Sequence, residues 1–585
     1  MKKNRLFALL LAAAMLLTLM AACGGTESQS AASSAPAETQ QEAAETPTEA
    51  ASPEASAETS SEASAETVEA AEPTYHLPIS EEPLTYSIWM TYAPFAADLV
   101  NTETMEGMLV LDTLQEVTNI HFDVTAANGA AEQDNFNLMI AAGDYCDILS
   151  SMSFYGTGLE GAVEEGILQD LADILPEKCP TYWSYLSENT NTLMQAYTDS
   201  GYMPTICVMT PEVGQEVVGP VLRKDWLDEF GMEMPTSLDE LYAYLEKSYQ
   251  EKGAIYELGA TDGLTGDIAY GLNLSFGDIS TPGAFRVVDG EAQFSMAQEE
   301  FKDYLKFMNR LYENKLISQD FFSDTSEDLS SKARLDFGAG TNSLVSVSAN
   351  NTTDIIMNVT DENFEMAVMP YVSADGKTEN HVGPSSLCDT MKDNDPWAFS
   401  TECEDIEPLL EMVEFLFSDE GFMLANYGVE GETYTLDENG EPQYTDLVIN
   451  NPDGLSYFFA SYVYTTNAAS GFFPYINDMS KTFYDFNDNQ WQVFEDLKDL
   501  SDCAWNYPAY AKLTTDESAQ YNSIESDIST YMDSRVLEFI TGASDIDAEF
   551  DSFVETLYSM GLQDLIDFKQ DAYDRAIERM ETFTA

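Results

Sequence analysis

The stretch Leu84-Thr85-Tyr86-Ser87-Ile88-Trp89-Met90 decides the fold, because a regular alternation of strands and helices begins there. Apolar residues occupy every second position along it, a pattern typical of a β-strand. The segments that follow are predicted as helix, strand, helix and strand in turn, over 102–117, 120–124, 134–142 and 147–152. This order is the signature of a parallel sheet whose connections are right-handed helical crossovers.

Further along the chain, less regular segments interrupt this alternation. Pro204 and Pro211 bracket one stretch that could cross between two lobes. Capping boxes are predicted at Ser237 and at Ser295, where the second box pairs with Gln298. The other predicted elements are helices over 238–248, up to 312 and over 406–417, a strand over 364–368 and two C-terminal helices hinged at Gly561. The pattern predicts two α/β lobes, although a single large α/β enzyme is also possible on the pattern alone.

The residues before this body resemble an export signal. Met1 to Arg5 is positively charged, and Leu6 to Met20 is an apolar run shorter than the ~20 residues that a membrane-spanning helix needs. Cys23 follows two alanines, as in the lipobox of bacterial lipoproteins, where the thiol is acylated. We expect residues 1–22 to be a lipoprotein signal peptide and Cys23 to carry the lipid. The alternative is an ordinary cleaved signal followed by an unrelated cysteine.

A polar segment separates the signal from the folded body. Residues 23–82 are dominated by Ala, Ser, Glu, Thr and Pro, and they hold too few apolar residues to offset the entropy cost of ordering. We expect a disordered tether. Together with a lipid at Cys23, it would hold the protein at the cell membrane on the extracytoplasmic side.

The charge balance excludes one class of partner. The chain has 104 acidic residues against 24 basic ones, and no Lys or Arg occurs between Arg5 and Lys178. Such a surface repels phosphate backbones, so we expect no nucleic-acid binding. The same imbalance favours solubility outside the cell and says little about the fold.

The cysteines and histidines offer few sites for metal or imidazole chemistry. The chain has seven cysteines, and six remain if Cys23 is acylated. An even number permits disulfides, but their wide separation and the lack of a CxxC pair favour buried free thiols. None of the three histidines lies within helical spacing of another, so the usual zinc arrangements are absent. We expect no metal and no cofactor.

Two short motifs suggest ligand sites only at first sight. The run 156–161 matches GxGxxG, but it follows the third predicted strand, and no acidic residue ends a strand ~20 residues later. A glycine-rich loop at the mouth of a cleft is the better interpretation. The run 437–440 resembles the start of a calcium loop, but the ligand spacing fails, and Asn439-Gly440 is typical of a hairpin turn.

Aromatic residues gather where the predicted strands end. Trp89 lies in the first strand with Tyr92 just beyond it, and Phe154 and Tyr155 follow the third strand. Ligands of parallel α/β sheets bind beyond the carboxyl ends of the strands. Flat amphipathic rings at that edge suit the apolar faces of sugars, so these four residues are candidate ligand contacts. For each ring, packing in the core is the competing interpretation.

In an ordered set of segments, the chain resembles the extracellular solute-binding lipoproteins (family 1 type) of ABC transporters, in their large oligosaccharide-type branch. The segments that carry the resemblance are 138–144 with 147–148, 223–227 with Gly231 and Pro235, 304–317, 426–431 through 434–437, and 539–542 through 572–575. Each segment is weak by itself. Together they span nearly the whole expected body in order.

The resemblance implies a bilobed type II periplasmic-binding fold without catalysis. Placed on this sequence, the first α/β lobe comprises residues 83–205 plus 369–420, and the second comprises 206–368 plus 421–585. The lobes would close on a small-molecule solute, and an oligosaccharide is the expected ligand. The implied partners are the permease subunits of an ABC importer, and we expect a monomer.

The resemblance also adds two residues to the candidate site. By position, the strand around Arg223 and the region of Trp397 would line the cleft, with Arg223 as a charged hydrogen-bond donor and Trp397, like Trp89, as a stacking ring. An ion pair between the lobes is the competing role for Arg223. Some relatives carry a calcium loop after the helix that corresponds to 238–248, but residues 249–254 lack its ligands.

Two other functions remain open at this point. One is an extracellular carbohydrate-active enzyme on a similar tether. The other is a receptor for a peptide or another non-sugar solute.

Overall fold

The computed structural model describes most of the chain after residue 73. The described residues are 74–92, 99–102, 104–127, 132–210, 218–256, 285–321, 326–348, 352–372, 381–383, 391–455, 457–466, 472–478, 480–481, 484 and 486–584. The expected signal peptide, Cys23 and most of the expected tether lie outside these ranges.

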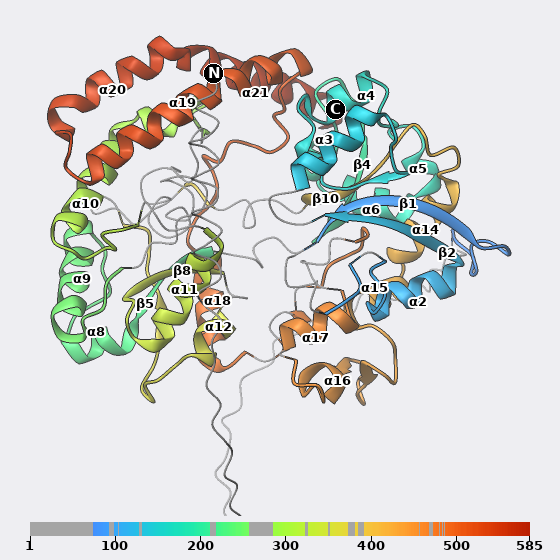
Figure 1. Cartoon of the computed structure of the whole chain (residues 1–585), viewed down its shortest axis with the longest axis horizontal. Coiled ribbons are helices and arrows are strands. Elements are labelled where there is room, and N and C mark those ends of the chain that lie inside the picture. Colours follow the sequence, from blue (N-terminus) through green and yellow to red (C-terminus); the bar gives the residue numbers. More distant parts are fainter. Residues whose placement is uncertain are drawn as a thin grey trace, which may run out of the picture. The chain divides into compact units, whose positions relative to one another are not determined.

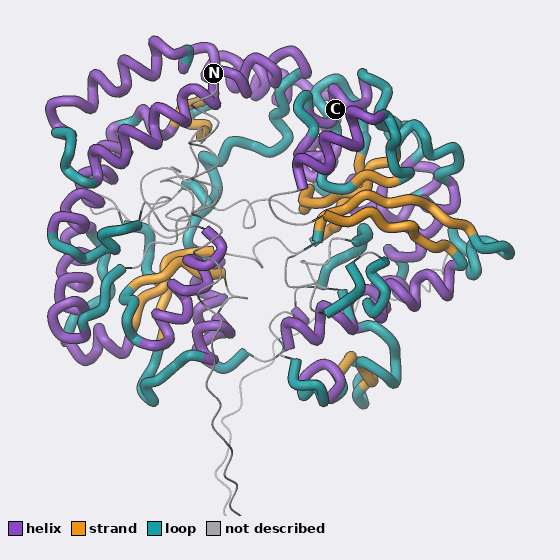
Figure 2. The backbone as a smooth tube through the Cα atoms, in the orientation of Figure 1, coloured by secondary structure: helices purple, strands orange, loops and turns teal. Residues whose placement is uncertain are grey.

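A five-stranded mixed sheet forms the first lobe (Figures 1 and 2). In spatial order its strands are β2 (Ile120–Ala127), β1 (Leu84–Thr91), β3 (Ile148–Leu149), β10 (Met391–Phe399) and β4 (Thr205–Met209). β1 pairs in parallel with both β2 and β3, which confirms the predicted parallel arrangement. β10 lies antiparallel between β3 and β4.

Helices cover both faces of this sheet. Its helical segments are η3 (Met152–Phe154), α2 (Leu109–Thr118), α3 (Glu132–Ala142), α4 (Gly158–Glu164), α5 (Leu175–Lys178), α6 (Pro180–Glu188), α7 (Thr190–Ala196), α14 (Glu407–Leu416), α15 (Asp419–Tyr427), α16 (Asp446–Ile449) and α17 (Tyr457–Tyr464). Alternate residues of β1 enter different cores: Ile88 and Met90 pack with α2 and α14, whereas Trp89 packs with α3 and α4. A small hairpin, β11 (Tyr434–Leu436) and β12 (Pro442–Tyr444), closes at Gly440, as predicted.

A three-stranded antiparallel sheet forms the second lobe, with the spatial order β8 (Leu344–Ser348), β5 (Val218–Arg223) and β9 (Met366–Val368). Its other elements are β6 (Phe285–Val288), β7 (Glu291–Phe294), η6 (Ser295–Ala297), α8 (Lys224–Phe230), α9 (Leu238–Lys252), α10 (Glu299–Glu313), α11 (Ser326–Ala339), α12 (Thr352–Met357), α18 (Asp488–Lys498), α19 (Thr515–Ile540), α20 (Ile546–Met560) and α21 (Leu562–Thr584). α8, α9, α10 and the three C-terminal helices contribute to one core, and α11, α12 and α18 to the other.

The order of the described elements shows three passages of the chain between the lobes, although most of the connecting residues lie outside the described ranges. The chain leaves the first lobe after β4, returns before β10, and leaves again between residue 478 and α18. The buried residues Leu424, Tyr462 and Phe473 belong to the core of the first lobe, although the sequence analysis assigned this stretch to the second. We therefore propose a last boundary near residue 478 instead of residue 421.

The end of the expected tether is part of the folded body. Tyr75 packs edge-on against Phe415 with 5.4 Å between ring centroids, and Ile79 is buried. The Ile79 amide donates to the Thr118 carbonyl at 3.0 Å. Residues from 74 onward therefore belong to the folded body, because the side chains of Tyr75 and Ile79 pack on the first lobe.

Two predicted helix starts are wrong. The helix expected from residue 102 begins at Leu109, because Asn101 and Glu106 pair across a tight turn before it. The capping box expected at Ser295 does not form: residues 295–297 are a 3-10 turn, and Gln298 makes no side-chain cap on α10. By contrast, Ser237 caps α9 by accepting from the Glu240 amide, as predicted, but the Glu240 side chain accepts from Thr236 instead of the Ser237 amide, so the predicted box does not close.

The cysteines divide into two kinds. The free thiols among the described residues are Cys146, Cys179, Cys207 and Cys403. Cys503 is disulfide-bonded, so the expectation of free thiols fails for that residue. Its partner lies outside the described residues.

Candidate ligand-binding site

The carboxyl ends of β1, β3 and β4 lie along one edge of the first sheet. β1 and β3 are parallel, and β10 runs antiparallel to both β3 and β4, so β4 also points toward this edge. Tyr92 follows β1, Ser150 follows β3 and Thr210 follows β4. Two of the three crossings, after β4 and before β10, also start or end at this edge. In open α/β sheets this edge is where ligands bind.

Two hydroxyls at this edge are buried and unpaired. The side chains of Ser150 and Thr210 are 1% and 9% exposed, and neither hydroxyl has a hydrogen-bond partner among the described residues. A buried unsatisfied hydroxyl costs about 1–3 kcal/mol, so such a group in a native structure calls for an explanation. Both could bond a polar group of a ligand that enters here.

Two tyrosines, Tyr92 and Tyr462, pack in the core of this lobe, and Tyr92 directly follows β1. Tyr92 is half-buried against the core that contains Tyr462 of α17. Burial and then the neighbouring Tyr92 raise the pKa of Tyr462 to about 12, so its hydroxyl stays protonated at neutral pH. Tyr92 therefore stands where the sequence predicted, at the end of β1 and partly accessible.

The third crossing is bound to the end of β4. The Met209 amide donates to the Tyr475 carbonyl at 3.0 Å, and the Asn477 amide donates to the Met209 carbonyl at 2.8 Å. Further on, Lys481 is buried, and its ammonium group donates to the Asn426 side chain at 3.0 Å and to the Thr466 carbonyl. The first-lobe ends of all three crossings thus lie side by side.

On the second lobe, Trp505 has a partly exposed indole and lies in a cluster beside the start of β5. It packs with Tyr371 and Val382, and the Tyr371 hydroxyl donates to the carbonyl of Val218, the first residue of β5 after the crossing. The backbone of Trp505 is held on both sides, by the His381 carbonyl at 2.8 Å and by the Val287 amide at 2.8 Å. Its position is therefore well defined.

Polar groups surround this indole. The His381 ring lies 4.5 Å from the Trp505 ring, and its Nδ1 is 2.9 Å from Asp502. The Ala504 amide and His381 lower the pKa of Asp502, which keeps it ionised. The Arg286 guanidinium lies 5.6 Å from the ring and is itself paired with Glu300 at 3.2 Å. An aromatic ring with a few polar groups beside it is a common composition of a small-molecule binding site.

Two of the predicted rings, Trp89 and Trp397, are core residues, and a third, Phe154, is partly buried against the core that contains Trp89. Trp89 is 1% exposed and packs edge-on against Phe136 and Phe154, with ring centroids 5.0 and 6.3 Å away. Trp397 is 1% exposed, and its Nε1 donates to the Phe472 carbonyl at 2.8 Å. In this arrangement neither indole has a free face, so ligand contact at Trp89 or Trp397 stays a prediction that would require the core to open.

The remaining predicted ring, Tyr155, is half-buried in the loop before α4. Its hydroxyl donates to Glu165 at 2.7 Å, and burial together with this carboxylate raises the pKa of Tyr155 to about 12. Within α4, a Cβ added to Gly161 would lie 2.3 Å from the Thr157 side chain and 3.2 Å from Thr515 of α19. This glycine of the GxGxxG run thus allows a close approach of another helix.

Arg223 lies at the far end of β5 from the crossing. The crossing enters β5 at Val218, so at about 3.3 Å per residue Arg223 is ~17 Å away along the strand. Its side chain is 1% exposed, forms two hydrogen bonds of 2.8 and 2.6 Å with Asp225, and lies between the rings of Trp226 and Phe364. The ion pair is within one lobe, whereas an interlobe pair was the expected alternative to ligand contact.

Sequence reasoning missed Ser150, Thr210, His381 and Trp505. Serine and threonine beside a strand carry no distinctive signal. Trp505 precedes Asn506, Tyr507 and Pro508 in a stretch without strand or helix periodicity, so nothing local separates it from any other loop tryptophan. Its place beside the crossings follows only from contacts with residues more than a hundred positions away.

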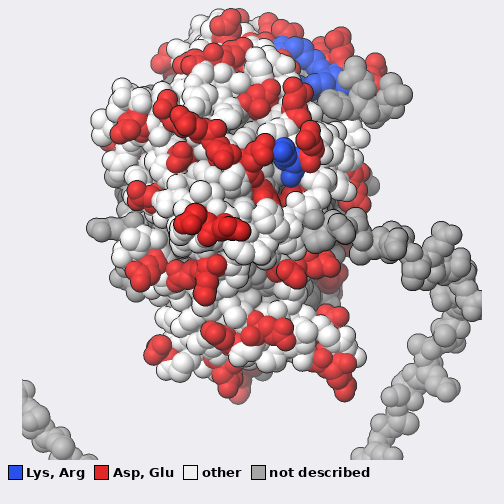
Figure 3. Space-filling view, turned by 90° about the vertical axis from the view of Figure 1, so that its right-hand side faces the viewer, with Lys and Arg blue, Asp and Glu red and all other residues white. Residues whose placement is uncertain are grey.

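One face of the molecule is strongly acidic. Figure 3 shows many acidic and few basic side chains on the face that it displays. Within the described ranges, no three His, Cys, Asp or Glu side chains come together in a group that could hold a metal ion. The helices described here also include none with the length and apolar character needed to span a bilayer.

No protein-family model matches the chain. Among curated proteins, it is similar to the polygalacturonan/rhamnogalacturonan-binding protein YtcQ of Bacillus subtilis (strain 168), with 23% identity over 340 residues, 56% of this chain and 63% of that relative. It is also similar to the lipoprotein LipO of Bacillus subtilis (strain 168), with 24% identity over 490 residues, 78% of this chain and 87% of LipO. A third relative is the fructooligosaccharide ABC transporter substrate-binding protein FusA of Streptococcus pneumoniae serotype 4, 24% identical over 230 residues, 37% of this chain and 42% of FusA.

Solved structures of similar fold cover nearly the whole described body. The alginate-binding protein AlgQ2 matches with a TM-score of 0.65 and 19% identity, covering 85% of this chain and 99% of AlgQ2. The S. pneumoniae protein FusA in complex with kestose matches with a TM-score of 0.66 and 18% identity, covering 85% of this chain and 100% of FusA. The chain is thus similar to substrate-binding proteins of ABC transporters, and its likeness to these solved structures shows that it has their bilobed α/β fold.

Proposed function

We propose that this protein captures an oligosaccharide between its lobes and delivers it to the permease subunits of an ABC importer. The observation that carries the proposal is that each lobe has polar and aromatic side chains beside the segments that connect the lobes. The first lobe offers the buried hydroxyls of Ser150 and Thr210, which have no hydrogen-bond partner among the described residues, and Tyr92 after β1; the second offers the Trp505 ring with His381 and Asp502. Aromatic faces for sugar rings and hydroxyl donors for their oxygens are what an oligosaccharide requires.

The names of the relatives support the same ligand class. YtcQ is described as binding polygalacturonan or rhamnogalacturonan, and FusA as serving fructooligosaccharides. Their ligands differ in charge and in linkage, so they support an oligosaccharide without naming one. Because these relatives are binding proteins, they also favour a receptor over the alternative of a tethered carbohydrate-active enzyme.

The proposed route to the membrane is the lipid on Cys23, with the polar tether between that anchor and residue 74. LipO, a lipoprotein, supports it. Capture would proceed by closure of the lobes, which removes water from the polar contacts and produces the shape that a permease would recognise.

The ligand class is tested by a thermal-shift screen with neutral fructo- and manno-oligosaccharides, oligogalacturonides and peptides. A ligand at about 100 times its dissociation constant stabilises the protein by about 2.7 kcal/mol, and we expect such a shift with at least one glycan. A shift with peptides alone would contradict the proposal. So would new reducing ends in the glycan incubations, because turnover would make the protein an enzyme.

The replacement Trp505→Ala tests the second-lobe half of the site. Truncation of a central aromatic contact costs about 2 kcal/mol, so we expect affinity for the glycan found in the screen to fall roughly 30-fold by calorimetry. Trp491→Ala is the matched control, since Trp491 is 41% exposed on α18 of the same lobe. Equal affinities of the two variants would remove Trp505 from the site.

The replacement Arg223→Met separates the two roles considered for that residue. Without the guanidinium, Asp225, whose side chain is 8% exposed, loses its ionic partner, and we expect a loss of about 3–5 kcal/mol in the free energy of unfolding. Lys224→Met, at an exposed pair with Asp228, should change stability by less than about 1 kcal/mol. If folded Arg223→Met protein bound glycan much more weakly than Lys224→Met protein, Arg223 would be a ligand contact after all.

The replacement Cys23→Ser tests the anchor. Without an acylated thiol the protein should appear in the medium of cells that export it, and its glycan affinity should be unchanged, because the expected tether separates Cys23 from the folded body. Fractionation and calorimetry measure the two properties. A Cys23→Ser protein that stayed in the membrane fraction would show that another feature holds it there.

A further inference from the structure

The C-terminal helix α21 contributes to both lobes. Its first turns, with Leu562 and Leu565, are buried in the second-lobe core beside α10 and α19. Its later turns carry Ala576, which is buried in a small separate cluster with Met194 of α7, a first-lobe residue. One continuous helix therefore spans from the core of one lobe to the surface of the other.

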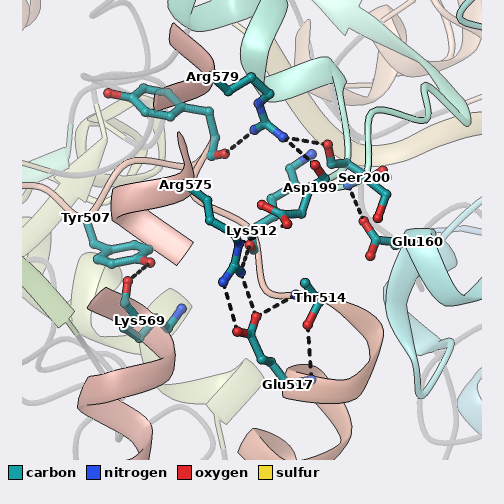
Figure 4. A network of polar contacts seen from close by, with 12 residues as sticks. Glu160, Asp199, Ser200, Tyr507, Lys512, Thr514, Glu517, Lys569, Arg575 and Arg579 are labelled. Atoms are coloured by element: carbon teal, nitrogen blue, oxygen red, sulfur yellow. Dashed lines mark hydrogen bonds and ion pairs between the residues drawn. The ribbon is translucent and has the colours of Figure 1, made fainter. Parts of the chain in front are cut away.

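Two arginines fasten this end of α21 to the first lobe, and each has partners in both lobes (Figure 4). Arg575 donates through Nε to Asp199 at 2.9 Å, and through its two terminal nitrogens to Glu517 of α19 at 2.9 and 2.7 Å. Arg579 donates to the carbonyls of Thr198 and Asp199 at 2.8 and 3.1 Å, and to the Tyr510 carbonyl of the second lobe at 3.1 Å. Charge-assisted bonds of this kind are about twice as strong as neutral ones.

The first-lobe side of this contact is a preformed turn. The Thr198 amide donates to the Tyr202 carbonyl at 2.8 Å, and the Gly201 amide donates back to the Thr198 carbonyl at 3.1 Å. The Ser200 amide donates to Glu160, a buried residue of α4, at 2.8 Å. The turn is thus held by the first lobe itself and does not depend on α21 for its shape.

The second-lobe side is also fixed before contact. Glu517 is the third residue of α19 and closes a capping box with Thr514. Burial alone would raise the pKa of Glu517, but the hydrogen bonds from Arg575 and from the Thr514 amide hold that pKa below its usual value. Nearby, Lys512 donates to the Gln195 carbonyl and Thr515 donates to Glu164 at 3.0 Å, both across the lobes.

We propose that the end of α21, seated on the turn 198–202 through Arg575 and Arg579, is a pivot between the lobes. The crossings form one fixed connection between the lobes, and the contact of Arg575 and Arg579 with the turn 198–202 forms a second. All of the charge-assisted bonds, and the Met194–Ala576 contact, would have to break together for the helix to leave the first lobe. Movement of the lobes is therefore confined to rotation about an axis through the crossings and this contact. Such a rotation brings the candidate ligand-binding residues of the two lobes together along one path.

The pivot is tested without any ligand, by the distance between spin labels on the two lobes. Leu138 of α3 and Met357 of α12 are 67% and 63% exposed, so Leu138→Cys/Met357→Cys gives accessible labels on the first and second lobes. We expect Arg575→Met/Arg579→Met in this background to widen the distribution of label-to-label distances at least twofold, as measured by pulsed electron paramagnetic resonance. A protein without the two introduced cysteines corrects for label on Cys146, a half-buried free thiol.

Two further variants keep the result interpretable. Arg310→Met removes an exposed ion pair with Asp239 inside the second lobe and should leave the distribution unchanged. If the double variant does not fold, Asp199→Asn removes the interlobe carboxylate charge while retaining the Arg579 contacts, and a smaller widening is expected. If every folded variant of Arg575, Arg579 and Asp199 left the distance distribution unchanged, the proposed pivot would be wrong. That result would leave the proposed glycan-binding function untouched.

Discussion

The rest of the structure depends on the hydrogen bonds at one end of the first sheet, where the carboxyl ends of β1, β3 and β4 lie. β4 ends there, β10 begins there, and residues 475–477 are bonded alongside through Met209. Because parallel strands share their carboxyl ends, the loops best suited to bind a ligand emerge at the same edge as the segments that connect the lobes. Binding and lobe movement are therefore coupled by topology, before any particular side chain is considered.

In the second lobe, the start of β5 and the residues packed around it lie next to a crossing. β5 starts at Val218 directly after a crossing, and Tyr371 and Trp505 pack around this start. The lobe's large apolar core lies beyond, against α10, α19 and α20, where it gives the short three-stranded sheet a rigid support. The partly exposed ring of Trp505 thus lies beside the start of β5, on a loop whose backbone is hydrogen-bonded on both sides.

The candidate site was only partly predictable from the sequence. Both faces of the first sheet are covered by helices, so a strand alternation that looks one-sided in sequence has cores on both sides. Trp89 enters one of these cores for that reason, although its position near a strand end resembles that of a ligand contact. Tyr92 was predictable because it stands beyond the last strand residue. The burial of Arg223 was not, because it depends on the Asp225 ion pair and on the rings of Trp226 and Phe364, and Phe364 is far away in the sequence.

The sequence by itself determined the local elements and the class of fold: the β1 alternation, the Ser237 cap, the Asn439-Gly440 hairpin and the Gly561 break are all set by residues a few positions apart. It also indicated a two-lobed body and its resemblance to solute-binding proteins. The tertiary structure alone decided which side chains meet. Trp505 beside Tyr371 and Arg575 on Asp199 join residues separated by more than a hundred positions, and the free energy of such contacts depends on the packing of whole lobes, which no local pattern encodes.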